Sequence, residues 1–141
     1  MKFPKASYSL RTRILYVEDD EDTRELVILV LAVKDCDVIA TASHHEALRL
    51  AQTELFDLYL IDNWMPGVSG LGLCERFREF DQHTPILFYS GAAYETDIES
   101  ALSRGAQGYL VKPAGAEELT AEVLRLISAS RTERAIRAHT N

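Results

Sequence analysis

Short apolar runs alternate with helix-like segments along the whole of this 141-residue chain. The strand-like runs fall at about residues 14–18, 37–42, 57–62, 86–90 and 108–112. The helix-like segments lie between and after them, at about 22–33, 44–54, 70–80, 95–104 and 116–130. Parallel strands need crossover connections, which helices usually supply. The alternation therefore predicts an α/β fold, with five helices packed on both faces of a doubly wound, five-stranded parallel sheet.

The chain is long enough for one folded domain with a hydrophobic core. We place an N-terminal tail at residues 1–12, the domain at 13–130 and a basic C-terminal helical extension or tail at 131–141. The helical pattern weakens beyond residue 130, so we expect the extension to fray. A second folded output module does not fit, which predicts a stand-alone domain.

Capping residues mark several helix ends in the sequence. Asp22 and Glu25 have the spacing of a capping box that would open the first helix. Ser43 and Ser69 are expected to cap the second and third helices. Gly105 follows the fourth helix, where a left-handed residue commonly ends a helix.

The first helix is apolar at every position from Leu26 to Val33. A helix on one face of a sheet buries only part of its circumference, so some of these side chains should stay exposed. The terminal tails could cover this surplus, or it could form a docking or dimer surface. Some of Val27, Ile28, Leu31 and Ala32 should be left over, and the tail residues that could cover them are Phe3, Tyr8, Leu10 and Ile136.

Charge is distributed unevenly along the chain. The net charge is −7, with +4 in residues 1–13, +2 in residues 131–141 and −13 between them. An acidic body argues against direct nucleic-acid binding and favours a cation site. There is no secretory signal or membrane-length apolar run, and Cys36 and Cys74 have neither metal-site nor disulfide spacing. We expect a cytoplasmic protein without membrane contact.

Polar residues close four of the expected strands at their carboxyl ends. Glu18 and Asp19 end the first strand, Asp62 the third, Ser90 the fourth and Lys112 the fifth. In a parallel sheet these ends share one edge, and the strand order 2-1-3-4-5 reverses between strands one and three. The sequence therefore predicts that the carboxylates meet at a ligand site.

This set of residues fits phosphoryl transfer. Three close carboxylates repel one another unless a cation holds them, and an all-oxygen set suits Mg²⁺. Lys112 and Ser90 add an ammonium and a hydroxyl near Asp62. Phosphoryl transfer needs positioning and neutralisation of the phosphoryl oxygens, so Asp62 would be the nucleophile that forms an acyl phosphate.

Four motifs, V-E-D (17–19), L-I-D-N-W-M-P-G (60–67), F-Y-S-G (88–91) and G-Y-L-V-K-P (108–113), together resemble the receiver domain of two-component response regulators. The resemblance covers about residues 13–130 and implies a flavodoxin-like fold. It implies that Asp62 accepts a phosphoryl group from a phosphohistidine of a sensor histidine kinase or histidine phosphotransfer protein.

The resemblance also implies roles for the surrounding residues. Asp19, Asp62 and the Trp64 backbone carbonyl would bind Mg²⁺, and Glu18 would hold the metal through water. Ser90 and Lys112 would contact phosphoryl oxygens. Tyr109 would be the switch aromatic, and the Lys112–Pro113 peptide is expected to be cis.

We therefore expect a phosphorylation-activated switch that contacts a downstream protein target, with a homodimer as a further outcome of phosphorylation. It would not be an enzyme beyond its own phosphoryl transfer and autodephosphorylation. One alternative is a fragment of a longer regulator or hybrid kinase, which the full reading frame would reveal. The other is an aspartate-nucleophile phosphatase, which typically has a second aspartate two residues on, where this chain has Trp64.

Overall fold

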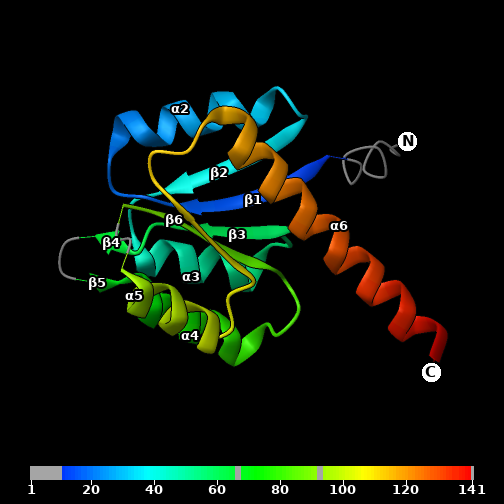
Figure 1. Ribbon diagram of the computed structural model, residues 1–141. Coiled ribbons are helices and arrows are strands. Elements are labelled where there is room, and N and C mark those ends of the chain that lie inside the picture. Colours follow the sequence, from blue (N-terminus) through cyan, green and yellow to red (C-terminus); the bar gives the residue numbers. More distant parts are fainter. Residues whose placement is uncertain (1–10, 66–67, 92–93, 141) are drawn as a thin grey trace.

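Five parallel strands form the central sheet of the computed structural model, which describes residues 11–65, 68–91 and 94–140 (Figure 1). The sheet order is β2-β1-β3-β6-β7, which confirms the predicted order 2-1-3-4-5. Its strands are β1 (Thr12–Val17), β2 (Cys36–Thr41), β3 (Leu58–Ile61), β6 (Ile86–Ser90) and β7 (Gly108–Val111). The helices are α2 (Glu21–Ala32), α3 (His44–Thr53), α4 (Gly70–Phe80), α5 (Glu95–Ser103) and α6 (Ala116–Thr140).

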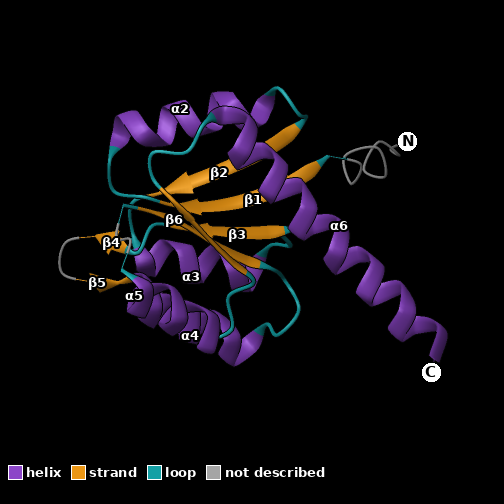
Figure 2. Ribbon diagram, in the orientation of Figure 1, coloured by secondary structure: helices purple, strands orange, loops and turns teal. Residues whose placement is uncertain are grey.

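A short antiparallel pair, β4 (Trp64–Met65) and β5 (Val68–Ser69), lies outside the central sheet. The sequence did not predict it, because Pro66 and Gly67 indicated only the end of a strand. The pair lies beside the carboxyl ends of the parallel strands (Figure 2). It therefore borders the edge where the candidate site was expected.

Helices cover both faces of the sheet, as the alternating pattern predicts. Helices α2 and α6 lie on one face, and α3, α4 and α5 on the other (Figure 1). Alternate strand residues point to opposite faces, so Leu58 and Leu60 pack with the α2 and α6 side while Tyr59 and Ile61 pack with the other. Because every residue of β3 is buried, this strand forms the centre of the core.

Two of the predicted N-terminal helix caps are confirmed and one is wrong. The Ser43 hydroxyl accepts a hydrogen bond from the Glu46 amide, and Ser69 caps α4 in the same way. Helix α2, however, begins at Glu21, and the Asp20 carboxylate accepts from the Thr23 amide at 2.9 Å. The proposed capping box from Asp22 is therefore incorrect, because that residue already lies inside the first turn.

Helix α5 ends in the left-handed geometry predicted at Gly105. Its φ is 110°, a value that favours glycine. The Ala106 amide donates to Ala101 O and the Gly105 amide to Leu102 O, both at 3.1 Å. This pair of bonds is the Schellman pattern, which satisfies carbonyls at a helix end.

The exposed apolar residues of α2 differ partly from those expected. Val27 and Leu31 are buried against the sheet, whereas Leu26, Leu29 and Val33 are exposed by 61%, 67% and 79%. Val27 and Leu31 are four residues apart and therefore face the same side of the helix, which here is the side that packs on the sheet. Phe3, Tyr8 and Leu10, which were proposed to cover the surplus, lie outside the described residues. Ile136 is itself 61% exposed.

Helix α6 continues to Thr140 without the fraying expected after residue 130. Its last turns extend beyond the amino edge of the sheet (Figure 2). Arg131 forms an ion pair with Asp57 at 3.4 Å, and Arg137 Nη1 lies 3.1 Å from His83 Nδ1. Neither glycine nor proline interrupts the helix. Among the described residues, no helix has both the length and the apolar character needed to cross a bilayer.

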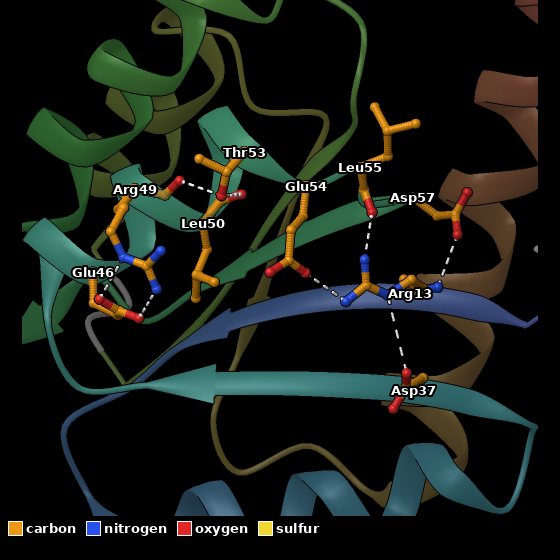
Figure 3. A network of polar contacts seen from close by, with 9 residues as sticks. All are labelled: Arg13, Asp37, Glu46, Arg49, Leu50, Thr53, Glu54, Leu55 and Asp57. Carbon is orange, nitrogen blue, oxygen red and sulfur yellow. Dashed lines mark hydrogen bonds and ion pairs between the residues drawn. The ribbon is translucent and has the colours of Figure 1, made fainter. Parts of the chain in front are cut away.

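Arg13 organises the amino edge of the sheet (Figure 3). Its guanidinium donates to Glu54 Oε1 at 2.8 Å and to Leu55 O at 3.1 Å, and its amide donates to Asp57 Oδ2 at 2.8 Å. The guanidinium carbon also lies 4.8 Å from the Phe56 ring centroid. One side chain of β1 thus fixes the loop that leads into β3.

A second polar cluster lies at the same edge, around Asp81. The Tyr59 and Thr84 hydroxyls donate to Asp81 Oδ2, each at 2.7 Å, and the His83 and Thr84 amides donate to Oδ1. Burial acts to raise the pKa of Asp81, but these hydrogen bonds outweigh it and lower the pKa to about 2. Asp81 therefore stays ionised and stabilises the folded state.

We expect the Asp81 charge to contribute about 1 to 2 kcal/mol to the free energy of unfolding at neutral pH, with allowance for its partial exposure. Because the folded pKa is lowered, this contribution is present above about pH 4 and is lost as the pH falls toward 2. Urea unfolding of wild type and Asp81→Asn across this range should show a stability difference that closes at low pH. Asp22→Asn, at an exposed acid in α2, serves as the control. A difference that stays constant with pH for Asp81→Asn would contradict the assignment.

Candidate functional site

Three carboxylates meet at the carboxyl edge of the sheet, as the sequence predicted. Glu18 and Asp19 follow β1, and Asp62 follows the adjacent strand β3. The Asp62 amide donates to Val17 O at 3.0 Å, so the strand pairing holds this residue in register. One carboxylate oxygen from each residue lies within 4.8 Å of the others. Glu18 is 2% exposed and Asp62 is 4% exposed, whereas Asp19 faces solvent.

The Lys112 ammonium lies between two of these carboxylates. Its Nζ is 2.7 Å from Glu18 Oε1 and 3.8 Å from Asp62 Oδ2. The ammonium also lies 5.2 Å from the centroid of the Tyr89 ring, which packs on the face of the sheet covered by α2 and α6. The Lys112–Pro113 peptide is cis, as predicted. Lys112 therefore approaches Asp62 but makes its shorter contact with Glu18.

Tyr16 is a member of this site that the sequence analysis missed. It is fully buried in β1, and its hydroxyl donates to Glu18 Oε1 at 3.0 Å. Burial raises the pKa of Tyr16, and the nearby Glu18 charge raises it further, so the hydroxyl stays protonated. In the sequence Tyr16 looks like one more apolar residue of the strand. Its position two residues before Glu18, on the same side of the strand, was the available signal.

Ser90 and Tyr109 lie toward the other face of the sheet. Ser90 ends β6 and is completely buried, and the Lys112 amide donates to its carbonyl at 2.9 Å. Tyr109, in β7, is partly buried and stacks on Phe88, with ring centroids 5.5 Å apart and planes 5° apart. Phe88 and Ser90 are two residues apart in β6, so both side chains point to the face that carries Tyr109.

Trp64, the remaining predicted site residue, is described only by its backbone. It forms part of β4, directly after the Asp62 turn. Its side chain, together with Pro66 and Gly67, lies outside the described residues. The predicted metal contact of its carbonyl therefore stays a prediction.

The donor set of the site suits a hard divalent cation. The groups that converge are carboxylate oxygens, without a sulfur or imidazole ligand in the described cluster. Mg²⁺ and Ca²⁺ prefer such oxygen ligands, and Mg²⁺ usually keeps several waters and takes only one or two carboxylates. A cation would also balance the excess of three carboxylates over one ammonium. Glu18, Asp19 and Asp62 are the residues that would hold it.

Comparison with known proteins gives one family. Residues 14–124 match the model of the response regulator receiver domain. The transcriptional regulatory protein DltR of Streptococcus agalactiae is 35% identical over 111 residues, which are 79% of this chain and 50% of that protein. The chain thus spans about half the length of this relative.

Solved structures agree with this family. The receiver domain of the Francisella response regulator 1452 superposes with a TM-score of 0.79 at 25% identity, covering 85% of this chain and 99% of that one. A CheY-like receiver domain protein from Methanospirillum hungatei gives a TM-score of 0.83 at 24% identity, covering 87% and 98%. At that identity the second similarity concerns the fold alone.

Gly70 lies directly behind Asp62, at the start of α4. A Cβ atom at this position would lie 2.8 Å from Asn63 Cα and 2.9 Å from Asp62 O, and both of these are backbone atoms. A Cβ at Gly72, in the same helix, would meet no atom within 4 Å. The absence of a side chain at Gly70 thus allows α4 to pack against the backbone that carries Asp62.

We expect Gly70→Ala to lower the free energy of unfolding by about 1 to 3 kcal/mol, because the backbone of Asp62 and Asn63 must shift to make room. The matched control Gly72→Ala should raise it slightly, by up to about 0.5 kcal/mol, since alanine has a higher helix propensity than glycine and Gly72 lies in the first turn. Urea unfolding of both variants measures the contrast. Equal effects of the two substitutions would show that the close approach at Gly70 is not a constraint.

Proposed function

This chain belongs to the response regulator receiver family, and on that premise we propose that Asp62 is its phosphoacceptor. Receiver domains are signalling switches of two-component systems rather than classical enzymes. Phosphorylation of Asp62 would be the event that operates this switch. The donor would be a phosphohistidine of a sensor histidine kinase or histidine phosphotransfer protein.

The observation that carries this proposal is the environment of the Asp62 carboxylate. Asp62 is almost fully buried, with carboxylate oxygens of Glu18 and Asp19 within 4.8 Å and the Lys112 ammonium at 3.8 Å. Further carboxylates beside it are costly for stability but useful for holding a cation next to a nucleophile.

The reaction would proceed by in-line attack at phosphorus. An oxygen of the Asp62 carboxylate forms a bond to phosphorus, and the bond from phosphorus to the imidazole nitrogen of the donor breaks. The imidazole keeps the bonding electrons and takes up a proton. Lys112 and the Ser90 hydroxyl would neutralise and position the phosphoryl oxygens.

Mg²⁺ fits the oxygen donors of the site, and we propose that Glu18, Asp19, Asp62 and the Trp64 carbonyl hold it. When bound, the cation would offset negative charge on the transferring phosphoryl group. Asp19, just after β1, would supply a ligand and Glu18 would hold the cation through water, while Asp62 would supply a ligand from the neighbouring strand end. The same arrangement would place the nucleophile beside the cation.

Ser90 and Tyr109 would report phosphorylation to the surface. Both side chains lie on the face covered by α3, α4 and α5, and Tyr109 stacks on Phe88 within β6 and β7. A movement of Ser90 toward the phosphoryl group would alter the packing that Tyr109 meets. We propose the surface of α5, β7 and α6 as the part that changes for a downstream protein or a second copy.

The exposed apolar residues of α2 would form the docking surface for the phosphodonor. Leu26, Leu29 and Val33 offer an apolar stripe on a helix that begins next to Glu18 and Asp19. Such a stripe suits packing against helices of a partner protein. We propose no direct contact with nucleic acid, since the residues between the two basic ends are strongly acidic.

Asp62→Asn should abolish labelling by acetyl phosphate in the presence of Mg²⁺, because an amide cannot form the acyl phosphate. Intact-mass spectrometry would show one added phosphoryl group in the wild type and none in the variant, and chelation of Mg²⁺ should also prevent labelling. Asp57→Asn, at a partly buried aspartate of the opposite sheet edge, should retain labelling. Label that persists in Asp62→Asn would contradict the proposed function.

A further inference from the structure

Two donors share a single oxygen of Glu18. The Tyr16 hydroxyl reaches Glu18 Oε1 at 3.0 Å and the Lys112 ammonium reaches the same atom at 2.7 Å. The other oxygen, Oε2, accepts a longer hydrogen bond of 3.3 Å from the Asp20 amide. Glu18 is only 2% exposed, so water offers little replacement for a lost donor.

The Lys112 ammonium cannot contact Glu18 and a phosphoryl group on Asp62 equally well at the same time. In the proposed function it contacts a phosphoryl oxygen on Asp62, yet its ammonium lies closer to Glu18 than to Asp62. If the ammonium moves to the phosphoryl group, Glu18 Oε1 loses its charged donor. A buried carboxylate oxygen that is left without a donor is costly.

Tyr16 can compensate for this loss because it does not move with Lys112. Its ring is fully buried on the face that α2 and α6 cover, packed in one cluster with Leu60 and Tyr89. Lysine has a long flexible stem, whereas a packed tyrosine ring keeps its hydroxyl in place. The Tyr89 ring, 5.2 Å from the ammonium, adds a second contact that keeps Lys112 near the site.

We propose that Tyr16 is a positioning residue for phosphoryl transfer, whose hydroxyl holds the Glu18 carboxylate while the Lys112 ammonium moves from Glu18 to the phosphoryl group on Asp62. This inference rests on the proposed function of Asp62. Tyr16 itself touches neither the phosphoryl group nor its donor and acts through Glu18. It lowers the energetic cost of releasing Lys112.

Tyr16→Phe tests the inference, since it removes the hydroxyl and keeps the ring. At saturating Mg²⁺, the rate constant for labelling by acetyl phosphate should fall about tenfold, because the release of Lys112 then leaves Glu18 Oε1 without a side-chain donor. Tyr59→Phe is the matched control. It also removes a buried tyrosine hydroxyl from a carboxylate, that of Asp81, but at the amino edge of the sheet.

A second readout needs neither Mg²⁺ nor phosphoryl transfer. In urea unfolding with a chelator present, Tyr16→Phe should lower the equilibrium constant for folding about tenfold in the wild-type background and only about threefold in Glu18→Gln, because hydrogen bonds to charged groups are stronger. Such a difference would show that the hydroxyl acts on the Glu18 charge. Equal effects in the two backgrounds would overturn the inference.

The labelling outcomes separate this inference from the proposed function. If the wild type is labelled at Asp62 and Tyr16→Phe slows labelling while Tyr59→Phe does not, both stand. If the wild type is labelled but the two phenylalanine variants react equally fast, the role of Tyr16 is wrong and the phosphoacceptor stands. If the wild type takes no label at Asp62, both fail.

Discussion

Two carboxylates that have lost almost all contact with water determine how this structure is arranged. Transfer of an ionised carboxylate from water into a protein interior costs several kcal/mol unless partners compensate for it. Glu18 and Asp62 follow adjacent strands, so each also raises the cost of burying the other. The Lys112 ammonium, 94 residues away from Glu18 in the chain, offsets part of this repulsion. The parallel sheet is what allows this contact, because it gathers distant strand ends at one edge.

Charged side chains have different surroundings at the two edges of the sheet. At the amino edge, Asp81 accepts hydrogen bonds from two hydroxyls and two amides, and Arg13 is bound by residues of one short loop. Each of these charges has several hydrogen-bond partners, which stabilises the fold. At the carboxyl edge, three carboxylates converge near one ammonium, and Glu18 also accepts hydrogen bonds from the Tyr16 hydroxyl and the Asp20 amide. Such a concentration of like charge is unfavourable for stability and is typical of a site that binds a cation.

Much of the fold could be predicted because burial leaves a clear mark on the sequence. Short apolar runs such as Leu58–Ile61, which alternate with helix-like segments, favour buried strands, and Ser43 and Ser69 stand directly before helical patterns. The site residues Glu18, Asp19, Asp62 and Lys112 could be predicted to meet, since all follow strands of one parallel sheet. Their roles in phosphoryl transfer and metal binding stay predictions until they are tested.

What the sequence could not supply depends on exact geometry. Asp20 and Asp22 are equally good caps by residue type, and only the end of β1 decides between them. Gly70 looks like any residue at a helix start, although backbone atoms of Asp62 and Asn63 leave no room for a Cβ. Tyr16 resembles an ordinary core residue in the sequence, because the strand pattern does not show which group its hydroxyl contacts. Such features depend on distances between separate elements, which a periodic pattern does not encode.

The position of each polar group also determines where a phosphorylation signal can travel. Lys112 lies with Tyr89 and Tyr16 on the side of the sheet covered by α2 and α6, whereas Ser90 points toward the opposite face, where Phe88 and Tyr109 stack. A phosphoryl group on Asp62 would contact both Lys112 and Ser90, one from each side of the sheet. Because packed interiors respond by discrete rearrangement rather than by gradual deformation, a shift of Lys112 and a shift of Ser90 would alter opposite faces together. Asp62, at the edge that both faces share, is suited to such coupling.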